Sequence, residues 1–121
     1  MSRHILFVDD EVPIRETLSL YFKRKGYSVT TAANAEGAMQ AAKDNTFTVV
    51  ILDIDLGGDN GLELLGFFKK NHPTIPVIMF TSLGYDPVLL KESMARGASA
   101  YMSKAESLDN LFKEVQRVCA V

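Results

Sequence analysis

The sequence lacks several features that would indicate a secreted, membrane-bound or nucleic-acid-binding protein. It contains a single cysteine, Cys119, so the chain cannot form an internal disulfide bond. The apolar run before Asp9 is too short for the core of a signal peptide, and no run approaches the roughly 20 residues of a membrane span. The formal net charge of −2 is too small to indicate nucleic acid or an anionic surface as a partner. We therefore expect a protein of the reducing cytoplasm that binds neither nucleic acid nor membrane.

Nucleotide-binding loops are missing as well. No Gly-x-x-x-x-Gly-Lys or Gly-x-Gly-x-x-Gly pattern occurs, which argues against two common phosphate-cradling loops. A flavin phosphate is disfavoured because the acids Asp9 and Asp10, which follow the first apolar run, would repel it. The two histidines, His4 and His72, are not arranged as metal ligands.

Length and composition favour one globular domain. The 121 residues fall within the usual size of a single domain. A chain of this size buries about two-thirds of its unfolded surface, so it needs no structural metal to fold. Hydrophobic residues make up 47% and charged residues 23%, which is typical of a globular protein. We expect residues 1–121 to form one domain.

What the sequence does contain is a strand pattern and a helix pattern that alternate five times. Ile5–Val8, Val49–Leu52 and Val77–Phe80 lack polar alternation, so both faces of these strands should be covered, as in a parallel sheet with helices on each side. Tyr27–Thr31 and Ala98–Met102 supply two further strands. Right-handed crossovers and a switch point beside the first strand then predict the strand order 2-1-3-4-5. This is an α/β fold, a flavodoxin-like three-layer sandwich.

Helix starts are marked by residues that suit a first turn. Pro13 is tolerated there, and Asn34, Asp86 and Ser107 can cap the helices that follow them. The segment 57–61 is rich in glycine and aspartate, and we expect it to be a loop.

Chemically active residues follow four of the five strands. The acids Asp9 and Asp10 follow the first strand, Asp53 follows the third, Thr81 the fourth and Lys104 the fifth. Because the carboxyl ends of parallel strands meet at one edge of a sheet, these side chains should lie close together. Carboxylate oxygens are the ligands that Mg²⁺ prefers, and a carboxylate can also accept a phosphoryl group. The set predicts a site for a divalent cation and a phosphoryl group.

Each member of this set has a simpler interpretation when it is taken alone. An acidic pair such as Asp9 and Asp10 commonly stabilises the start of a helix. Thr81 suits a strand because it is β-branched, and Lys104 suits a solvated loop. Tyr101 suits the hydrophobic core. The phosphoryl-site interpretation depends on all of these strand ends carrying compatible chemistry together.

These residues and their spacing resemble the receiver domain of two-component response regulators. The likeness covers essentially the whole chain, including Gly61 eight residues after Asp53 and Tyr101 three residues before Lys104. The resemblance implies that Asp53 is the phosphoacceptor and that the divalent cation is Mg²⁺, with Mn²⁺ as an alternative ion. It implies the following metal ligands: Asp9, Asp10, Asp53 and the backbone carbonyl of Asp55. It further implies that Thr81 and Lys104 hold the phosphoryl group and that Thr81 and Tyr101 form a conformational switch.

Two positions depart from the pattern of this family. Gly57 stands where the family commonly has proline, so we expect a looser loop, since glycine admits more backbone conformations. Ala105 follows Lys104 where the family usually has proline, often after a cis peptide bond. A cis bond costs about 2.5–4 kcal/mol before alanine but only about 0.5–1 kcal/mol before proline. We therefore expect the chain after Lys104 to take another path.

The resemblance implies a signalling role in a phosphorelay. Its partners would be a sensor histidine kinase or a phosphotransfer protein, and an output domain or a second receiver, as part of a longer protein or as a stand-alone one. The domain would assist its own phosphorylation and dephosphorylation without being an enzyme that acts on a separate substrate. The alternative is an interaction domain of the same fold that works without phosphorylation. A haloacid-dehalogenase-type hydrolase, suggested by Asp53-Ile54-Asp55, is rejected because those enzymes carry this motif on their first strand and are considerably longer.

Overall fold

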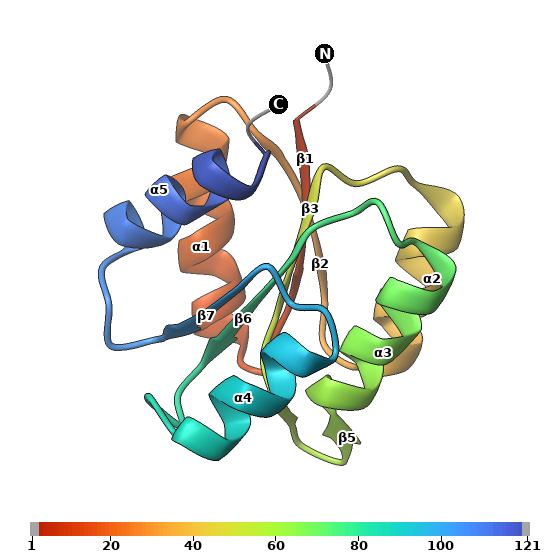
Figure 1. Ribbon diagram of the computed structural model, residues 1–121. Coiled ribbons are helices and arrows are strands. Elements are labelled where there is room, and N and C mark those ends of the chain that lie inside the picture. Colours follow the sequence, from red (N-terminus) through yellow and green to blue (C-terminus); the bar gives the residue numbers. More distant parts are fainter. Residues whose placement is uncertain (1–2, 120–121) are drawn as a thin grey trace.

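The computed structural model describes residues 3–119, which form a five-stranded parallel sheet covered by helices on both faces (Figure 1). The sheet strands are β1 (His4–Val8), β2 (Ser28–Ala32), β3 (Val49–Leu52), β6 (Val77–Thr81) and β7 (Ala100–Ser103). A separate two-stranded hairpin comprises β4 (Asp55–Leu56) and β5 (Asp59–Asn60). The helices are α1 (Val12–Arg24), α2 (Ala35–Asp44), α3 (Gly61–Asn71), α4 (Pro87–Ala95) and α5 (Leu108–Cys119).

The predicted topology is confirmed. The sheet order is β2-β1-β3-β6-β7, which is the predicted order 2-1-3-4-5 once the hairpin strands are left out of the numbering. Every neighbouring pair in this sheet is parallel, with Val8 opposite Leu52 and Leu52 opposite Met79. The carboxyl ends of β1, β3, β6 and β7 therefore lie at one edge of the sheet.

The hydrophobic core consists of two layers, one on each face of the sheet. One layer contains buried residues of α1 and α5, including Leu18, Phe22 and Leu111. The other contains buried residues of α2 and α3, including Ala38 and Phe68, and α4 adds a partly buried leucine to it. Figure 1 shows α1 and α5 together on one side and α2 and α3 on the other. Because both faces are covered, the central strands have no exposed apolar side.

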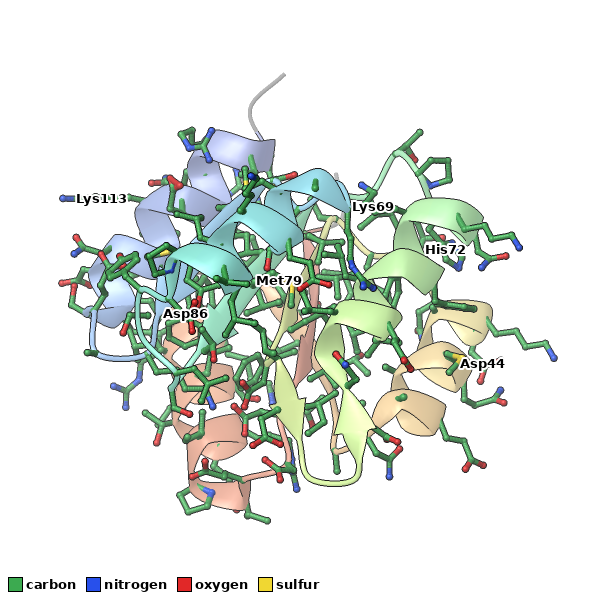
Figure 2. The ribbon with its side chains drawn as sticks, turned by 60° about the horizontal axis from the view of Figure 1, so that its bottom comes forward. Asp44, Lys69, His72, Met79, Asp86 and Lys113 are labelled. Atoms are coloured by element: carbon green, nitrogen blue, oxygen red, sulfur yellow. The ribbon has the colours of Figure 1, made fainter. Side chains whose placement is uncertain are left out.

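The predicted helix caps are confirmed. The side chain of Asn34 accepts a hydrogen bond from Gly37 N at 2.8 Å at the start of α2. Asp86 accepts from two backbone amides at the start of α4, and Ser107 Oγ accepts from Asn110 N at 3.1 Å beside α5. Figure 2 shows the same molecule with its side chains, with Asp86 and Asp44 on opposite sides of it. These caps fix where α2, α4 and α5 begin, at the edge that carries the chemically active residues.

The loop expected between β3 and α3 is instead partly a hairpin, and the looseness expected from Gly57 stays a prediction. Residues 55–56 pair with residues 59–60, and Gly57 lies in the turn at a φ of 75°. Proline, with its φ fixed near −65°, could not take this conformation. Asn60, at the end of the hairpin, then caps α3 by accepting from Leu62 N at 2.8 Å.

The second strand is shifted by one residue from the predicted Tyr27–Thr31. The Tyr27 amide donates to Phe22 O at 3.0 Å, so Tyr27 belongs to the turn that ends α1. The last strand starts later than predicted because the Ala98 amide closes α4 by donating to Ser93 O at 3.0 Å.

Within residues 3–119, none of the helices is both long and apolar enough to span a bilayer.

Candidate functional site

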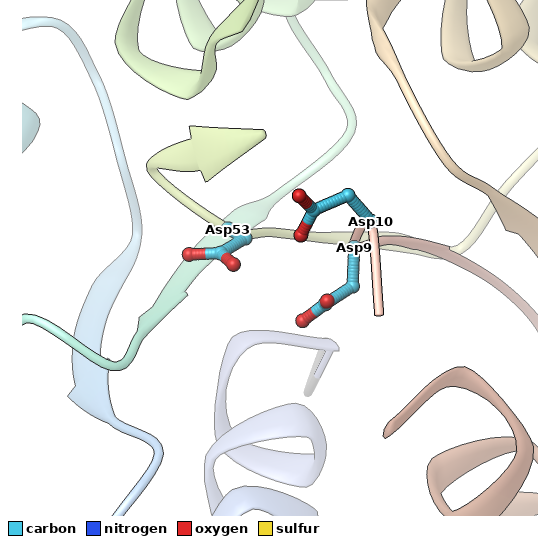
Figure 3. Close-up of side chains that lie close together, drawn as sticks. All are labelled: Asp9, Asp10 and Asp53. Atoms are coloured by element: carbon cyan, nitrogen blue, oxygen red, sulfur yellow. The ribbon is translucent and has the colours of Figure 1, made fainter. Parts of the chain in front are cut away.

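Three carboxylates meet at the carboxyl edge of the sheet, as the sequence predicts. Asp9 and Asp10 follow β1, and Asp53 follows the neighbouring strand β3 (Figure 3). One oxygen from each of the three lies within 4.8 Å of the others. Asp9 is 0% exposed and Asp53 is 2% exposed, whereas Asp10 is exposed to solvent. The cluster is therefore buried on one side and open at Asp10.

Lys104 neutralises the buried part of this cluster. Its Nζ lies 2.8 Å from Asp53 Oδ2 and 2.5 Å from Asp9 Oδ2, and its side chain is 10% exposed. The residue is fixed at the end of β7 because its amide donates to Thr81 O at 2.8 Å. One ammonium thus contacts both buried carboxylates.

The chain after Lys104 is held by Ser103, a residue that the sequence analysis did not single out. Ser103 Oγ accepts from the Ala105 amide at 3.1 Å, and Ser103 O accepts from the Glu106 amide at 3.1 Å. A proline in place of Ala105 would have no amide hydrogen to donate. The described residues contain no cis peptide bond. Lys104 reaches both acids along this path, so the absence of proline does not prevent the contact.

Burial and charge act in opposite directions on the two central groups. Desolvation raises the pKa of Asp53 above its ordinary value, although the hydrogen bond and charge of Lys104 oppose this, and the charge of Asp9 adds to the rise. Burial lowers the pKa of Lys104, but the hydrogen bonds and charges of Asp53 and Asp9 outweigh it, so the pKa is raised. Lys104 therefore remains a cation, and this one ammonium is shared between two buried carboxyl groups.

The donor set fits a hard divalent cation. Asp53 Oδ1 is buried and has no hydrogen-bond partner in the protein, which is costly for a carboxylate oxygen unless a cation or water meets it. The three clustered side chains all offer carboxylate oxygens, which suits Mg²⁺ or Mn²⁺. The Asp55 side chain is not part of this cluster, and its Oδ1 accepts from Gly57 N at 3.1 Å.

Thr81 and Tyr101, the two residues of the expected switch, both make hydrogen bonds to the loop that follows β6. Thr81 is fully buried at the end of β6, and its Oγ1 accepts from Leu83 N at 3.1 Å. Tyr101 is 7% exposed, and its hydroxyl donates to Gly84 O at 2.6 Å. Desolvation raises the pKa of Tyr101, so its hydroxyl stays a donor. Both residues therefore hold the loop that follows β6.

Arg15 is a further residue near the site that the sequence analysis missed. Its Nη1 donates to Asp9 O at 2.6 Å, and Asp9 Oδ1 accepts from Glu11 N at 2.9 Å. These contacts fix the turn from β1 into α1 and hold the Asp9 side chain inward. An arginine in the second turn of a helix is too ordinary for its spacing to reveal this role.

The arrangement supplies the parts of a phosphoryl-acceptor site. It has a buried carboxylate with one oxygen bound by lysine and one oxygen without a protein partner. It has two further acids, each with an oxygen within 4.8 Å of an Asp53 oxygen, and a buried hydroxyl at the end of the next strand. Phosphoryl transfer requires mainly such positioning and charge neutralisation.

Comparison with known families gives a match over nearly the whole chain. The model of the response regulator receiver domain matches residues 5–116. The transcriptional activator protein PfeR of Pseudomonas aeruginosa is 34% identical over 110 residues, which are 91% of this chain and 35% of PfeR. The nitrogen assimilation regulatory protein NtrX of Azorhizobium caulinodans is 34% identical over 119 residues, which are 97% of this chain and 26% of NtrX. The chain thus spans about a third or less of the length of these two relatives.

Solved structures of similar proteins have the same fold. The receiver domain of NtrX from Brucella abortus superposes with a TM-score of 0.87 at 35% identity, and the match covers 95% of this chain and 97% of that one. The response regulator TrrA from Thermotoga maritima, solved in complex with Mg²⁺ and beryllofluoride, gives a TM-score of 0.86 at 33% identity. That match covers 96% of this chain and 98% of TrrA.

Proposed function

The chain belongs to the family of response regulator receiver domains, and from this premise we propose that Asp53 accepts a phosphoryl group in a Mg²⁺-dependent reaction. The donor would be the phosphohistidine of a sensor histidine kinase or of a phosphotransfer protein. The observation that carries the proposal is the buried Asp53 carboxylate, which has Lys104 on one oxygen and no protein partner on the other.

In the proposed reaction a carboxylate oxygen of Asp53 attacks the phosphorus atom of the donor. A phosphorus–oxygen bond forms, the phosphorus–nitrogen bond of the phosphohistidine breaks, and its electron pair returns to the imidazole. Lys104 already lies 2.8 Å from Asp53 Oδ2, so a small movement of its ammonium can place it on a phosphoryl oxygen. The Thr81 hydroxyl would donate to a second phosphoryl oxygen.

Asp9, Asp10, Asp53 and the backbone carbonyl of Asp55 would hold the cation. Mg²⁺, or Mn²⁺ in its place, supplies neutralisation of the charge on the transferring group. The protein's own contribution is to keep Asp9 buried through its contacts with Arg15 and Lys104. The structure of TrrA with Mg²⁺ and beryllofluoride supports this assignment, because that protein has the same fold at 33% identity.

The proposed output is a change of the face formed by α4, β7 and α5. When Thr81 turns toward the phosphoryl group it leaves space behind it, and Tyr101, which is already directed inward, can occupy that space. Such a packing change requires only a few kcal/mol of difference in phosphate contacts between two states. The altered face would bind a partner, an output domain or a second receiver.

The cellular setting is part of the same proposal. We place the domain, residues 1–121, in the cytoplasm with a sensor kinase as its donor. In this role the chain binds neither nucleic acid nor membrane, and it assists its own phosphorylation and dephosphorylation. The relatives PfeR and NtrX are regulators of greater length, which supports a role of this domain in controlling an output.

Intact-mass measurement tests the proposed function. The protein is incubated with a small-molecule phosphodonor such as acetyl phosphate, with Mg²⁺ or with a chelator. We expect the mass of one phosphoryl group to be added only with Mg²⁺. If no mass is gained under either condition, the proposal fails and the alternative holds, namely an interaction domain that works without phosphorylation.

Metal affinity should depend on Asp10 much more than on its neighbour Glu11. Asp10 offers an oxygen to the cluster, whereas Glu11 is the exposed residue before α1. We expect Asp10→Asn to weaken Mg²⁺ binding by at least about tenfold. The same change should raise the melting temperature of the metal-free protein, because it removes repulsion among clustered acids. Calorimetric titration and thermal unfolding of Asp10→Asn and Glu11→Gln measure both effects. Equal Mg²⁺ affinity in Asp10→Asn and the unchanged protein would contradict the role of Asp10.

Thr81→Ala should separate phosphorylation from its output. We expect this variant still to accept the phosphoryl group at Asp53, because the attacking carboxylate and Lys104 remain. It should lose most of the changes in amide exchange that beryllofluoride and Mg²⁺ induce in α4, β7 and α5, because no hydroxyl draws the β6 end toward the site. Thr81→Ser, which keeps the hydroxyl, is the control and should retain those changes. Unaltered changes on that face in Thr81→Ala would show that the switch does not act through Thr81.

A further inference from the structure

The loop between β6 and α4, residues 82–86, is fixed by three side-chain contacts. The Leu83 amide donates to Thr81 Oγ1 at 3.1 Å, and the Gly84 carbonyl accepts from the Tyr101 hydroxyl at 2.6 Å. The hydroxyl of Tyr85 donates to Glu106 Oε2. The first two contacts involve the residues of the proposed switch. The third involves neither of them, and it ties this loop to the loop between β7 and α5.

The Tyr85–Glu106 contact links two chain segments, 81–85 and 104–106, which also meet at Thr81 and Lys104, so the two segments form a closed ring beside the phosphoryl site. At the base of the ring the Lys104 amide donates to Thr81 O at 2.8 Å, where β6 and β7 end. From there one segment runs from Thr81 to Tyr85 and the other from Lys104 to Glu106, and the two side chains join their far ends. A movement of Thr81 toward Asp53 therefore acts on a segment that is anchored at both ends.

Tyr85 is placed for this contact rather than for burial. Its side chain is 60% exposed, so packing explains little of its position, although its ring centroid lies 6.2 Å from that of Tyr101. The hydrogen bond to Glu106 raises the pKa of the Tyr85 hydroxyl, and desolvation adds to the rise. The hydroxyl is therefore a donor at neutral pH, and the half-buried Glu106 carboxylate is its acceptor.

We propose that Tyr85 and Glu106 form a latch that holds residues 82–86 in the resting arrangement and so opposes the movement of Thr81 toward the phosphoryl group. The latch deepens the proposed function and rests on it, since it regulates the response to phosphorylation of Asp53. Both are positioning residues, because they act through Thr81 and do not touch the phosphoryl group. A contact that exists only in the resting state favours that state, and its removal shifts the population toward the switched state.

Tyr85→Phe removes the hydroxyl and keeps the ring. We expect it to bind beryllofluoride in the presence of Mg²⁺ about threefold to tenfold more tightly than the unchanged protein, the effect of losing one hydrogen bond from the resting state. Isothermal titration measures the affinity, and amide exchange of residues 82–86 should be faster in the variant before ligand is added. A merely structural contact would not tighten binding when it is removed.

A matched control is available at the opposite pair of helices. Tyr21 donates to Asp109 Oδ1 at 2.5 Å between α1 and α5, so Tyr21→Phe removes an equivalent contact and should leave beryllofluoride affinity unchanged. In a Thr81→Ala background, Tyr85→Phe should have no effect, because the latch acts through Thr81.

Three outcomes overturn the latch. They are unchanged or weaker affinity in Tyr85→Phe, an equal gain in Tyr21→Phe, and a gain that persists in the Thr81→Ala background. All three presuppose that the unchanged protein binds beryllofluoride with Mg²⁺. If it does not, the phosphoryl site itself is refuted, and the latch is refuted with it.

Discussion

The Asp53→Asn protein should gain no mass on incubation with acetyl phosphate and Mg²⁺, under conditions in which the unchanged protein gains one phosphoryl group. Asparagine has nearly the shape of aspartate, but its neutral amide is a far poorer nucleophile than a carboxylate. Asp9 cannot substitute for it, because Asp9 Oδ2 is engaged by Lys104 and Asp9 Oδ1 by the Glu11 amide. The expected effect is therefore a complete loss of labelling, read by intact mass.

This variant should remain folded, so the loss cannot be attributed to unfolding. Burial raises the pKa of Asp53, which means that folding disfavours its ionised form. For an acid whose pKa is raised in the folded state, stability is greatest below the unfolded pKa and declines as the pH rises through the folded pKa. Asparagine has no such cost, so Asp53→Asn should melt at a temperature at least equal to that of the unchanged protein at neutral pH. The difference should shrink as the pH falls, since the carboxyl becomes neutral too.

Asp44→Asn is the matched control for labelling. Asp44, labelled in Figure 2, is the last residue of α2 and accepts a hydrogen bond from Gln40. Because β3 begins shortly after it, Asp44 lies toward the edge of the sheet opposite the site. The Asp44→Asn protein should be labelled as fully as the unchanged protein. If Asp53→Asn is labelled to the same extent as Asp44→Asn, the phosphoacceptor is another residue and the assignment is wrong.

The positions of the sheet strands and of the site acids could be predicted because strand ends are strong signals. Each central strand is a short apolar run that stops at a polar residue, and parallel pairing brings those stops to one edge. The sequence did not show how differently its two adjacent acids are placed. Asp9 is buried and held by the Glu11 amide and Lys104, whereas Asp10 lies in the bend after β1 and is exposed.

Short-range contacts between loops could not be predicted in the same way. The hairpin strands β4 and β5 have two residues each, too few to show a periodic pattern. Ser103, Tyr85 and Glu106 carry no pattern either, because their roles come from hydrogen bonds between loops that folding brings together. The sequence did mark Gly61 by its distance from Asp53, but the steric reason for a glycine there became visible only in the structure.

Gly61→Ala should destabilise the fold by about 3 kcal/mol, because it forces backbone atoms together. A Cβ on residue 61 would lie 2.0 Å from Asp53 O and 2.7 Å from Ile54 Cα, and neither backbone atom can rotate away. A hydrogen bond also holds these two backbone segments together, since the Gly61 amide donates to Ile54 O at 2.7 Å. The chain after Asp53 would have to move, which would displace the phosphoacceptor as well. Thermal unfolding should show a fall of about 10–15 °C for a domain of this size.

Gly66→Ala is the control because it introduces the same methyl group on the same helix. A Cβ on Gly66, in the middle of α3, meets no atom within 4 Å. Alanine should therefore stabilise the helix there by about 0.5–1 kcal/mol, since glycine loses more conformational entropy on folding. The two substitutions thus have opposite expected signs, and only Gly61→Ala should also slow the labelling of Asp53. A Gly61→Ala protein that melts at the temperature of the unchanged protein would show that the chain after β3 can move to accommodate the methyl group. The close approach of α3 to Asp53 would then not be needed to hold the site.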